Sequence, residues 1–261
     1  MIITTGNGPI PEIVLRAQTL ADRLNVEYKP RGTLSLPKLV ERYQDQEVLV
    51  VLQEAVRLLR PGLPPLQFHP SMGFVRAKRV LKGESDPMLE AAGMEPGDSV
   101  LDCTAGLGTD SLLFAVYGGE NSEITALESS LPLYGLLLEG MSHYTSGQEK
   151  VNAALRRIKV VYSDHLHYLK DQQDNSVDIV YFDPMFRQPL TDSAAISPLR
   201  QFANGAALSP ESVAEAVRVA RKAVLLKEKS LSGEFGRLGF TELLRNNSKT
   251  SYGVIQIGNP S

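Results

Sequence analysis

Four acidic residues occupy equivalent positions in the sequence. Each one ends or directly follows a short apolar run that is typical of a β-strand. They are Asp102, Glu128, Asp164 and Asp183. Carboxyl ends of parallel strands lie along one edge of a sheet, and open sheets bind their ligands at that edge. The alternative for each residue is a helix cap, because Asp often occupies strand-to-helix turns. Repetition after successive strands favours one shared ligand site.

A glycine turn follows the first of these runs, in the stretch Asp102-Cys103-Thr104-Ala105-Gly106-Leu107-Gly108-Thr109-Asp110-Ser111. Two glycines spaced by one residue allow a tight turn whose backbone approaches a ligand, and the following apolar segment starts a helix with unpaired amides. One Gly-x-Gly alone is a weak signal. A serine stands where a dinucleotide site has its third glycine, which disfavours a nicotinamide cofactor.

Two of the acids fit the two halves of an adenosine group. Glu128 lies about twenty residues after the second glycine, where a ribose-binding carboxylate belongs. Asp164 and the adjacent His165 follow the next strand, where they are placed to meet an adenine amino group.

The fourth strand end carries the segment Asp183-Pro184-Met185-Phe186. A carboxylate here accepts the hydrogens of a planar amine, the proline fixes the backbone direction, and the aromatic ring stacks on a base. Methyl transfer from a sulfonium is a direct displacement, so alignment supplies most of the catalysis. The alternative is a turn that ends the strand, with Phe186 in the core.

A basic segment precedes the glycine turn. Between Glu54 and Glu84 there is no acidic residue, whereas six basic residues occur there: Arg57, Arg60, Arg76, Lys78, Arg79 and Lys82. This segment predicts a local positive surface for the phosphates of a polyanion. A solvated helix face or linker is the alternative.

Alternation of strands and helices predicts an α/β protein with a Rossmann-like, mostly parallel sheet, a terminal antiparallel strand pair and a small N-terminal α/β lobe. We expect a lobe at 1–83 and the main domain at 84–261. Expected strands of the sheet are 99–102, 123–127, 158–162, 177–182 and 223–227, with helices at 84–96, 111–117, 131–141, 165–171 and 210–220. Residues 240–244 and 252–257 predict the antiparallel pair. In the lobe we expect strands at 1–5 and 47–52 and helices from 10 to 24 and from Ser35.

Composition limits the class of protein. The 261 residues are 43% hydrophobic and carry a net charge of −3, which argues against bulk electrostatic coating of nucleic acid. Apolar runs are too short to span a membrane and no secretion signal is evident, so we expect a cytoplasmic protein. The single cysteine, Cys103, is expected to pack rather than to react. Histidine spacing predicts no metal site.

The glycine turn with Asp110 resembles the first motif of class I S-adenosylmethionine-dependent methyltransferases, and Asp183-Pro184-Met185-Phe186 is similar to the Asp-Pro-Pro-Tyr motif of members that methylate amines. More specifically, the pair resembles the bacterial family that methylates guanine N2 of small-subunit ribosomal RNA. The resemblance implies S-adenosyl-L-methionine as cofactor and ribosomal RNA or the small subunit as partner. It implies cofactor contacts by Asp102, Ala105, Gly106, Gly108, Thr109, Asp110, Glu128, Ser129, Asp164, His165 and Asp183.

Catalytic roles are expected for Asp183, Pro184, Met185, Phe186 and Lys227. Lys227 ends the fifth strand, and its alternative is a surface lysine. The family has Arg in place of Thr109 and Lys-Arg-Pro in place of residues 227–229, so the RNA target stays open. The loop 187–204 is expected to form a substrate lid. Remaining alternatives are a nicotinamide oxidoreductase, a methyltransferase of protein or DNA, and a non-catalytic binding module on the ribosome.

Overall fold

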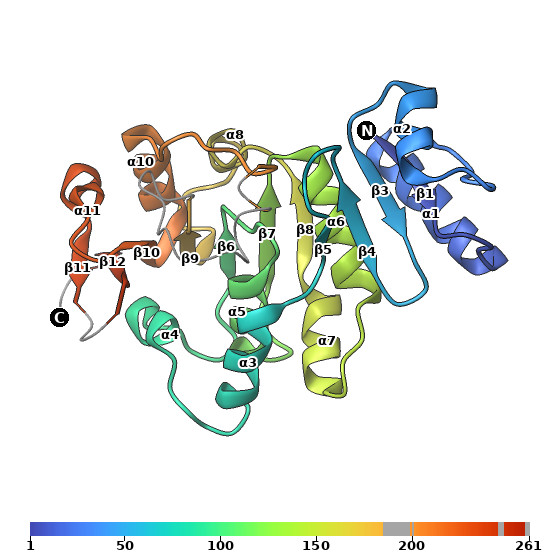
Figure 1. The fold of residues 1–261 in the computed structure, drawn as a ribbon. Helices are drawn as coiled ribbons and strands as arrows, with labels where there is room; N and C mark the ends of the chain where they lie inside the picture. Colours follow the sequence, from blue (N-terminus) through green and yellow to red (C-terminus); the bar gives the residue numbers. More distant parts are fainter. Residues whose placement is uncertain (185–198, 200, 245–247, 259–261) are drawn as a thin grey trace.

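The computed structural model describes residues 1–184, 199, 201–244 and 248–258. Within this part of the chain the strands form two sheets. The first has five strands in the order β2-β1-β3-β4-β5, and the second has seven in the order β11-β12-β10-β9-β6-β7-β8 (Figure 1). The sheets lie side by side, with the first at the right in Figure 1.

The first sheet is built by the N-terminal residues. Its elements are β1 (Ile2–Thr5), α1 (Pro11–Leu24), β2 (Glu27–Tyr28), α2 (Leu36–Tyr43), β3 (Val48–Val51), β4 (Val56–Leu59) and β5 (Leu66–Gln67). β1 pairs in parallel with β2 and β3, whereas β4 is antiparallel to β3 and β5. The predicted strands and helices are confirmed, and Ser35 caps α2 by accepting a hydrogen bond from Lys38 N–H. β2, β4 and β5 were not predicted.

The second sheet follows the two helices α3 (Ser71–Val80) and α4 (Pro87–Ala92). Its elements are β6 (Val100–Asp102), α5 (Thr109–Gly118), β7 (Ile124–Glu128), α6 (Leu131–His143), α7 (Glu149–Arg157), β8 (Lys159–Tyr162), α8 (His165–Lys170), β9 (Val177–Phe182), α10 (Pro210–Val219), β10 (Ala220–Lys229), α11 (Gly233–Leu238), β11 (Thr241–Leu243) and β12 (Thr250–Gln256). β8, β7, β6, β9 and β10 are parallel neighbours. β12 lies antiparallel between β10 and β11. The predicted Rossmann-like fold is confirmed.

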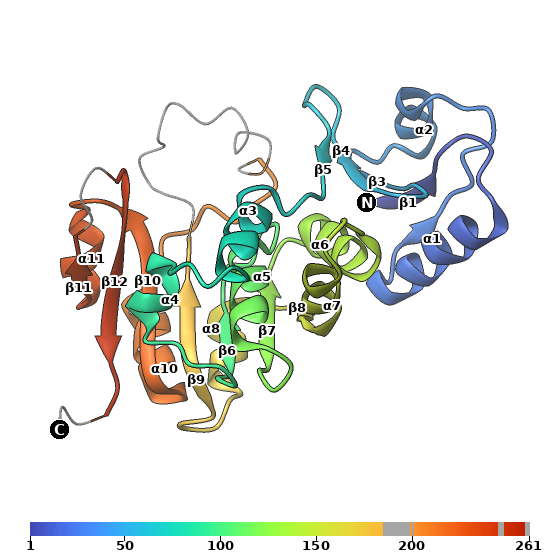
Figure 2. The same ribbon diagram turned by 90° about the horizontal axis from the view of Figure 1, so that it is seen from below.

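Helices cover both faces of the second sheet. In Figure 1 α3, α4, α5 and α7 lie below it, and α8 and α10 lie above it. Figure 2 looks onto the lower face and shows α3, α4 and α5 in front of the strands. From β6 the chain adds β7 and β8 on one side and then β9 and β10 on the other. The topological switch point, where such sheets bind ligands, is therefore between β6 and β9.

Helix α6 lies between the two sheets and contacts both. Two glycines of α6 allow the close approach: a Cβ at Gly135 would lie 2.6 Å from a Leu24 side-chain carbon, and one at Gly140 would overlap the Phe68 ring. One continuous hydrophobic core runs from the first sheet into the second. The domain boundary at residue 83 stays a prediction. α3 lies on the N-terminal side of that boundary and packs against α5 of the second sheet. None of the helices in the described ranges has the length and apolar character needed to cross a membrane.

Candidate active site

The predicted glycine turn joins β6 to α5. Gly106 and Gly108 have φ angles of 55° and 68°, in the left-handed region that favours glycine. Space also excludes a side chain at Gly108, because a Cβ there would lie 2.0 Å from Met141 Cε. The amides of Cys103 and Ala105 donate to carbonyls of the flanking strands β9 and β7. The turn is therefore fixed on both sides by the sheet.

The side chain of Asp102 stabilises this turn. It is buried, and its carboxylate accepts hydrogen bonds from the Thr104 amide and the Ser111 hydroxyl. Burial raises the pKa of Asp102 to about 7, although these two hydrogen bonds oppose the shift. Its predicted cofactor contact stays a prediction, and the contacts in the structure are those that stabilise the turn.

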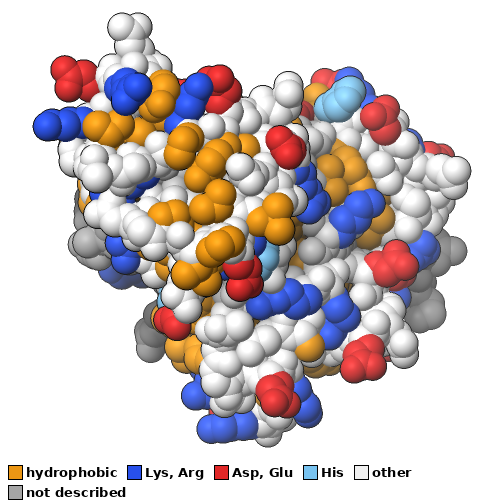
Figure 3. Space-filling model, turned by 90° about the vertical axis from the view of Figure 1, so that its right-hand side faces the viewer, with side chains coloured by type: hydrophobic (Ala, Val, Ile, Leu, Met, Phe, Trp, Pro, Cys, Tyr) orange, Lys and Arg blue, Asp and Glu red, His pale blue; other side chains and the backbone are white. Residues whose placement is uncertain are grey.

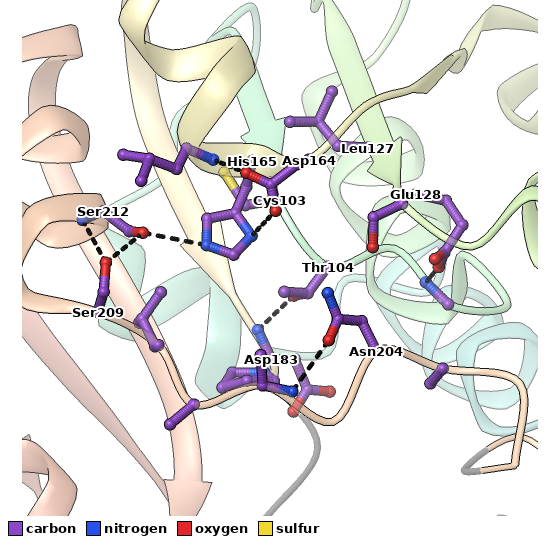
Figure 4. Close-up of a pocket in the computed structure, with 18 residues that line it drawn as sticks. Cys103, Thr104, Leu127, Glu128, Asp164, His165, Asp183, Asn204, Ser209 and Ser212 are labelled. Carbon is purple, nitrogen blue, oxygen red and sulfur yellow. Dashed lines mark hydrogen bonds and ion pairs between the residues drawn. The ribbon is translucent and has the colours of Figure 1, made fainter.

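A cavity of about 230 Å³ opens at the carboxyl edge of the sheet, beside the glycine turn (Figure 4). Seven predicted site residues line it: Gly106, Glu128, Ser129, Asp164, His165, Asp183 and Pro184. Predicted residues that do not belong to its described lining are Asp102, Ala105, Gly108, Thr109, Asp110 and Lys227. Ala203 and Asn204, the last residues of the predicted lid, also line the cavity. The prediction did not include the lining residues Cys103, Thr104, Leu127, Leu166, Ala206, Ala207, Leu208, Ser209 and Ser212. Several of these are small residues just before α10, a position without a sequence signal for a binding site.

Glu128 is the last residue of β7 and is largely buried. Its carboxylate accepts hydrogen bonds from the amides of Gly106 (3.2 Å) and Ser130 (2.8 Å). Burial raises the pKa of Glu128, while the backbone hydrogen bonds partly oppose this. The side chain thus ties the glycine turn to β7 and also borders the cavity (Figure 4).

Asp164 is both a helix cap and a cavity residue, so the two sequence-based alternatives are compatible. Its carboxylate accepts from the amides of Leu166 and His167 at the start of α8. His165 Nε2 lies 3.1 Å from Ser212 Oγ, which in turn lies 2.8 Å from Ser209 Oγ (Figure 4). Burial lowers the pKa of His165, which favours its neutral form.

Asp183 follows β9 and lies beside the glycine turn. Its amide donates to Thr104 Oγ1 at 2.6 Å, and its Oδ2 lies 2.7 Å from Lys227 Nζ. Burial raises the pKa of Asp183, and the charge of Lys227 opposes the shift. Cys103 is also buried against the cavity, and burial raises the pKa of its thiol, as expected of a packing residue.

Lys227 is a partly buried residue of β10 that forms two ion pairs. Besides Asp183, its Nζ contacts Asp110 Oδ2 at 3.0 Å. Burial alone would lower the pKa of Lys227, but the two carboxylates outweigh burial and raise it. The alternative of a surface lysine on an exposed strand end therefore does not describe Lys227, which is partly buried and paired.

The basic segment needs a correction at Arg76. Its guanidinium pairs with Asp86 and Asp110, so it faces the protein interior and is not available to a phosphate. Arg60 pairs with Glu47 and lies over the Phe202 ring. Two further arginines of the segment have polar partners, since Arg57 contacts Gln67 and Arg79 contacts Glu84. Lys78 lies near the Phe74 ring, and Lys82 is exposed. The face beside the first sheet mixes hydrophobic, basic and acidic side chains (Figure 3).

Some predicted features fall outside the described residues. These are Met185, Phe186 and most of the predicted lid at 187–204. Within the described ranges, no group of three or more His, Cys, Asp or Glu side chains is arranged to hold a metal ion.

The strand order, the glycine turn and the cavity at the carboxyl edge define a Rossmann-like fold of the methyltransferase class. The sequence model of one family matches residues 37–231, and that family is described as "Putative SAM-dependent methyltransferase". The chain belongs to this family, and S-adenosyl-L-methionine is therefore its cofactor.

Three relatives illustrate the range of similarity. A Bacillus subtilis (strain 168) protein described as "Uncharacterized protein YpiP" is 38% identical over 255 residues, which is 98% of this chain and 99% of that protein. "Ribosomal RNA small subunit methyltransferase J" of Acinetobacter baylyi is 34% identical over 107 residues, 40% of this chain and 38% of the relative. The crystal structure of the SAM-dependent methyltransferase NGO1261 from Neisseria gonorrhoeae superposes with a TM-score of 0.67 at 18% identity, covering 98% of this chain and 96% of that one. This last similarity shows the fold alone.

The residues present fit the cofactor. The cavity borders the glycine turn at Gly106, and a largely buried carboxylate, Glu128, borders the same cavity. A cationic sulfonium is also compatible with the carboxylates nearby, because among the described residues Asp86, Asp110 and Asp183 pair with two cations, Arg76 and Lys227.

Proposed function

We propose that this methyltransferase modifies an exocyclic amino nitrogen of a nucleobase, and that its substrate is guanine N2 in small-subunit ribosomal RNA. The observation that carries the proposal is the position of Asp183 and Pro184 on the cavity wall, next to the glycine turn. The similarity to ribosomal RNA small subunit methyltransferase J supports an RNA substrate. The chain covers little more than a third of that relative, so its substrate is carried over only as a proposal.

Asp183 is suited to orient an amine. Lys227 is hydrogen-bonded to Oδ2, and the backbone amide is fixed by Thr104, so the carboxylate is held in one position. A carboxylate oxygen that accepts an amine N–H turns the nitrogen lone pair toward the electrophile. Pro184 disfavours helical ψ angles at the preceding residue, which restricts the direction of the Asp183 carbonyl, the proposed second acceptor.

The cofactor supplies an electrophilic methyl group when it is bound. We assign ribose binding to Glu128 and Ser129, and adenine binding to Asp164 and His165, because these pairs border the cavity from successive strand ends. The glycine turn at Gly106 would face the aminoacyl end. No strong general base is needed, since an amine that has been methylated loses its proton readily to a nearby acceptor or to water.

The direct test measures transfer of labelled methyl groups from S-adenosylmethionine to small ribosomal subunits purified from a strain that lacks the protein. Nucleoside mass spectrometry then identifies the product, which we expect to be N2-methylguanosine. Asp183→Asn removes the proposed acceptor charge and should abolish transfer. Asp178→Asn is the matched control, because Asp178 lies near the start of β9, the strand that Asp183 follows, and is paired with Arg221 at the opposite edge of the sheet.

The outcomes separate the alternatives. Label in protein or DNA but not in RNA would overturn the proposed substrate while leaving the enzyme class intact. Cofactor binding without turnover on any RNA, by both the wild type and Asp183→Ala, would favour a non-catalytic module on the ribosome. A nicotinamide enzyme is disfavoured by the family and by Ser111, which is buried against Asp102 where a third glycine would stand.

A further inference from the structure

The carboxylate of Asp183 is connected to helix α3 through a series of ion pairs in which acidic and basic side chains alternate. Arg76 of α3 binds Asp86 with two hydrogen bonds of 2.8 and 2.7 Å and binds Asp110 Oδ1 at 2.5 Å. Asp110 Oδ2 contacts Lys227 Nζ, and the same Nζ contacts Asp183. Three helix elements are thereby connected to the ends of β9 and β10.

We propose that Arg76 and Asp110 are positioning residues for methyl transfer, which hold Lys227 against Asp183 so that this carboxylate stays ionised and correctly oriented. The inference rests on the proposed role of Asp183 in the reaction. It replaces the sequence-based expectation that Arg76 binds phosphate.

Burial makes the alternating order of charges important. Side-chain exposure is 19% for Arg76, 6% for Asp110 and 21% for Lys227. Charges removed from water are tolerated when each has an opposite charge and further hydrogen bonds. Here Asp110 has a cation on each oxygen, and its Oδ2 also accepts the Tyr181 hydroxyl at 2.8 Å. If Arg76 is removed, Lys227 is the one described cation that remains to pair with both Asp110 and Asp183.

Lys227 would then be drawn toward the more deeply buried partner, Asp110. The negative charge of Asp183 would then be balanced less well by a nearby cation, so its carboxylate would hold a proton more readily. Within the described ranges, the charged or titratable groups that act on Asp183 include Lys227 of β10, Glu228 of β10, Asp110 of α5, Arg76 of α3, Asp102 of β6 and Tyr181 of β9. Of these only Lys227 and Arg76 favour the ionised carboxylate, so loss of either cation shifts its titration to higher pH.

A purely structural role makes a different prediction. Arg76 also clamps α3 to the N-cap of α4 through Asp86, which accepts from the Met88 amide. If that clamp were its whole contribution, Arg76→Met would lower the stability of the protein by the same factor whether or not residue 183 carries a charge. The pH dependence of turnover in the folded variant would then match that of the wild type.

The test combines a thermodynamic cycle with a pH profile. Unfolding equilibria are measured for the wild type, Arg76→Met, Asp183→Asn and the double variant, all without substrate or cofactor. Arg76→Met should lower the folding equilibrium constant in both backgrounds. We expect this loss to be about tenfold smaller when residue 183 is Asn, because Lys227 then pairs with Asp110 alone. Arg221→Met is the matched control, since Arg221 binds Asp178 with the same two-bond geometry at the opposite sheet edge. Its effect should be the same in both backgrounds.

The second readout uses the folded variants and labelled cofactor. Arg76→Met should lower kcat about tenfold with a smaller change in KM for the cofactor, and should move the acid limb of the kcat profile upward by about one pH unit. Arg76→Lys, which keeps the charge, should restore the wild-type limb and also serves if the methionine variant does not fold. Additive unfolding effects together with an unshifted acid limb would overturn the inference. If the wild type methylates no RNA, the proposed function fails, and the unfolding cycle alone decides whether the network couples Arg76 to Asp183.

Discussion

Lys227 Nζ lies 2.7 Å from Asp183 Oδ2, so an ion pair bridges the ends of two neighbouring parallel strands beside the cavity. The pair fixes the carboxylate that we propose to orient the substrate amine. Substitution Lys227→Met should therefore lower kcat by about 100-fold, because misplacement of a reacting group by about an ångström has an effect of that size. The measurement is single-turnover methyl transfer with saturating cofactor.

Lys222→Met provides the control for this prediction. Lys222 also lies on β10 and also pairs with two carboxylates, Glu95 and Asp98, but at the other end of the strand. Its loss should leave the single-turnover rate unchanged. Equal rates for the two methionine variants would show that Lys227 has no special part in the reaction.

Gly108→Ala should destabilise the protein by about 3 kcal/mol, since the new Cβ would meet Met141 and the residue has a positive φ angle. Gly93→Ala separates the two causes. Gly93 has a similar φ angle of 59°, and a Cβ there meets nothing within 4 Å, so backbone strain alone should cost about 1 kcal/mol. Denaturant unfolding measures both variants. Adding Met141→Ala should recover part of the loss at Gly108 and none at Gly93.

Part of this site could be predicted from the sequence, and part could not. The four strand ends and the glycine turn were predicted, because strands and glycines leave local patterns that do not depend on distant residues. The role of Arg76 was not, since its partner Asp110 lies 34 positions further along the chain. Only the packing of α3 against α5 brings these two side chains together.

Helix α3 itself was missed for a related reason. It packs through Gly73 and Ala77, and a Cβ at Gly73 would lie 2.5 Å from the Thr109 carbonyl oxygen. Small residues allow this contact but leave no stripe of large apolar side chains, which is the usual signal of an amphipathic helix. Helix α7 was not predicted either, although its buried residues Val151, Ala154 and Leu155 have helical spacing.

Glu128→Gln should weaken binding of S-adenosylmethionine about tenfold, because a neutral amide offers one acceptor where the carboxylate offers two. The remaining acceptor still serves the Gly106 amide, so the turn should persist, whereas the hydrogen bond from the Ser130 amide is lost. Titration calorimetry measures the affinity, and Glu123→Gln is the control because Glu123 is exposed just before the opposite end of β7. Unchanged affinity in Glu128→Gln would remove this residue from the cofactor site.

The buried Asp102 should leave a signature in the pH dependence of stability. Its pKa is about 7 in the folded protein and about 3.8 in the unfolded chain, so between these values the folded state holds the extra proton. Its contribution to the unfolding free energy is therefore fully present below about pH 4 and is lost as pH rises toward 7, by roughly 1 kcal/mol per pH unit. Asp102→Asn removes the titration. The difference between the wild-type and Asp102→Asn unfolding curves should slope downward over this range, and a flat difference would contradict the raised pKa.

An RNA substrate should contact the exposed basic residues at the end of α3. Lys78 and Lys82 are exposed, and the structure gives neither of them a carboxylate partner in the described part of the chain. The double variant Lys78→Glu, Lys82→Glu should raise the Kd for small-subunit RNA at least tenfold and reduce the salt dependence of binding by about two counterions.

Lys159→Glu is the control, since this exposed lysine begins β8 at the edge opposite the cavity. Because phosphate contacts position the RNA without touching the reacting base, kcat at saturating RNA should stay near the wild-type value. A loss of kcat without a change in Kd would instead place these lysines in the reaction itself.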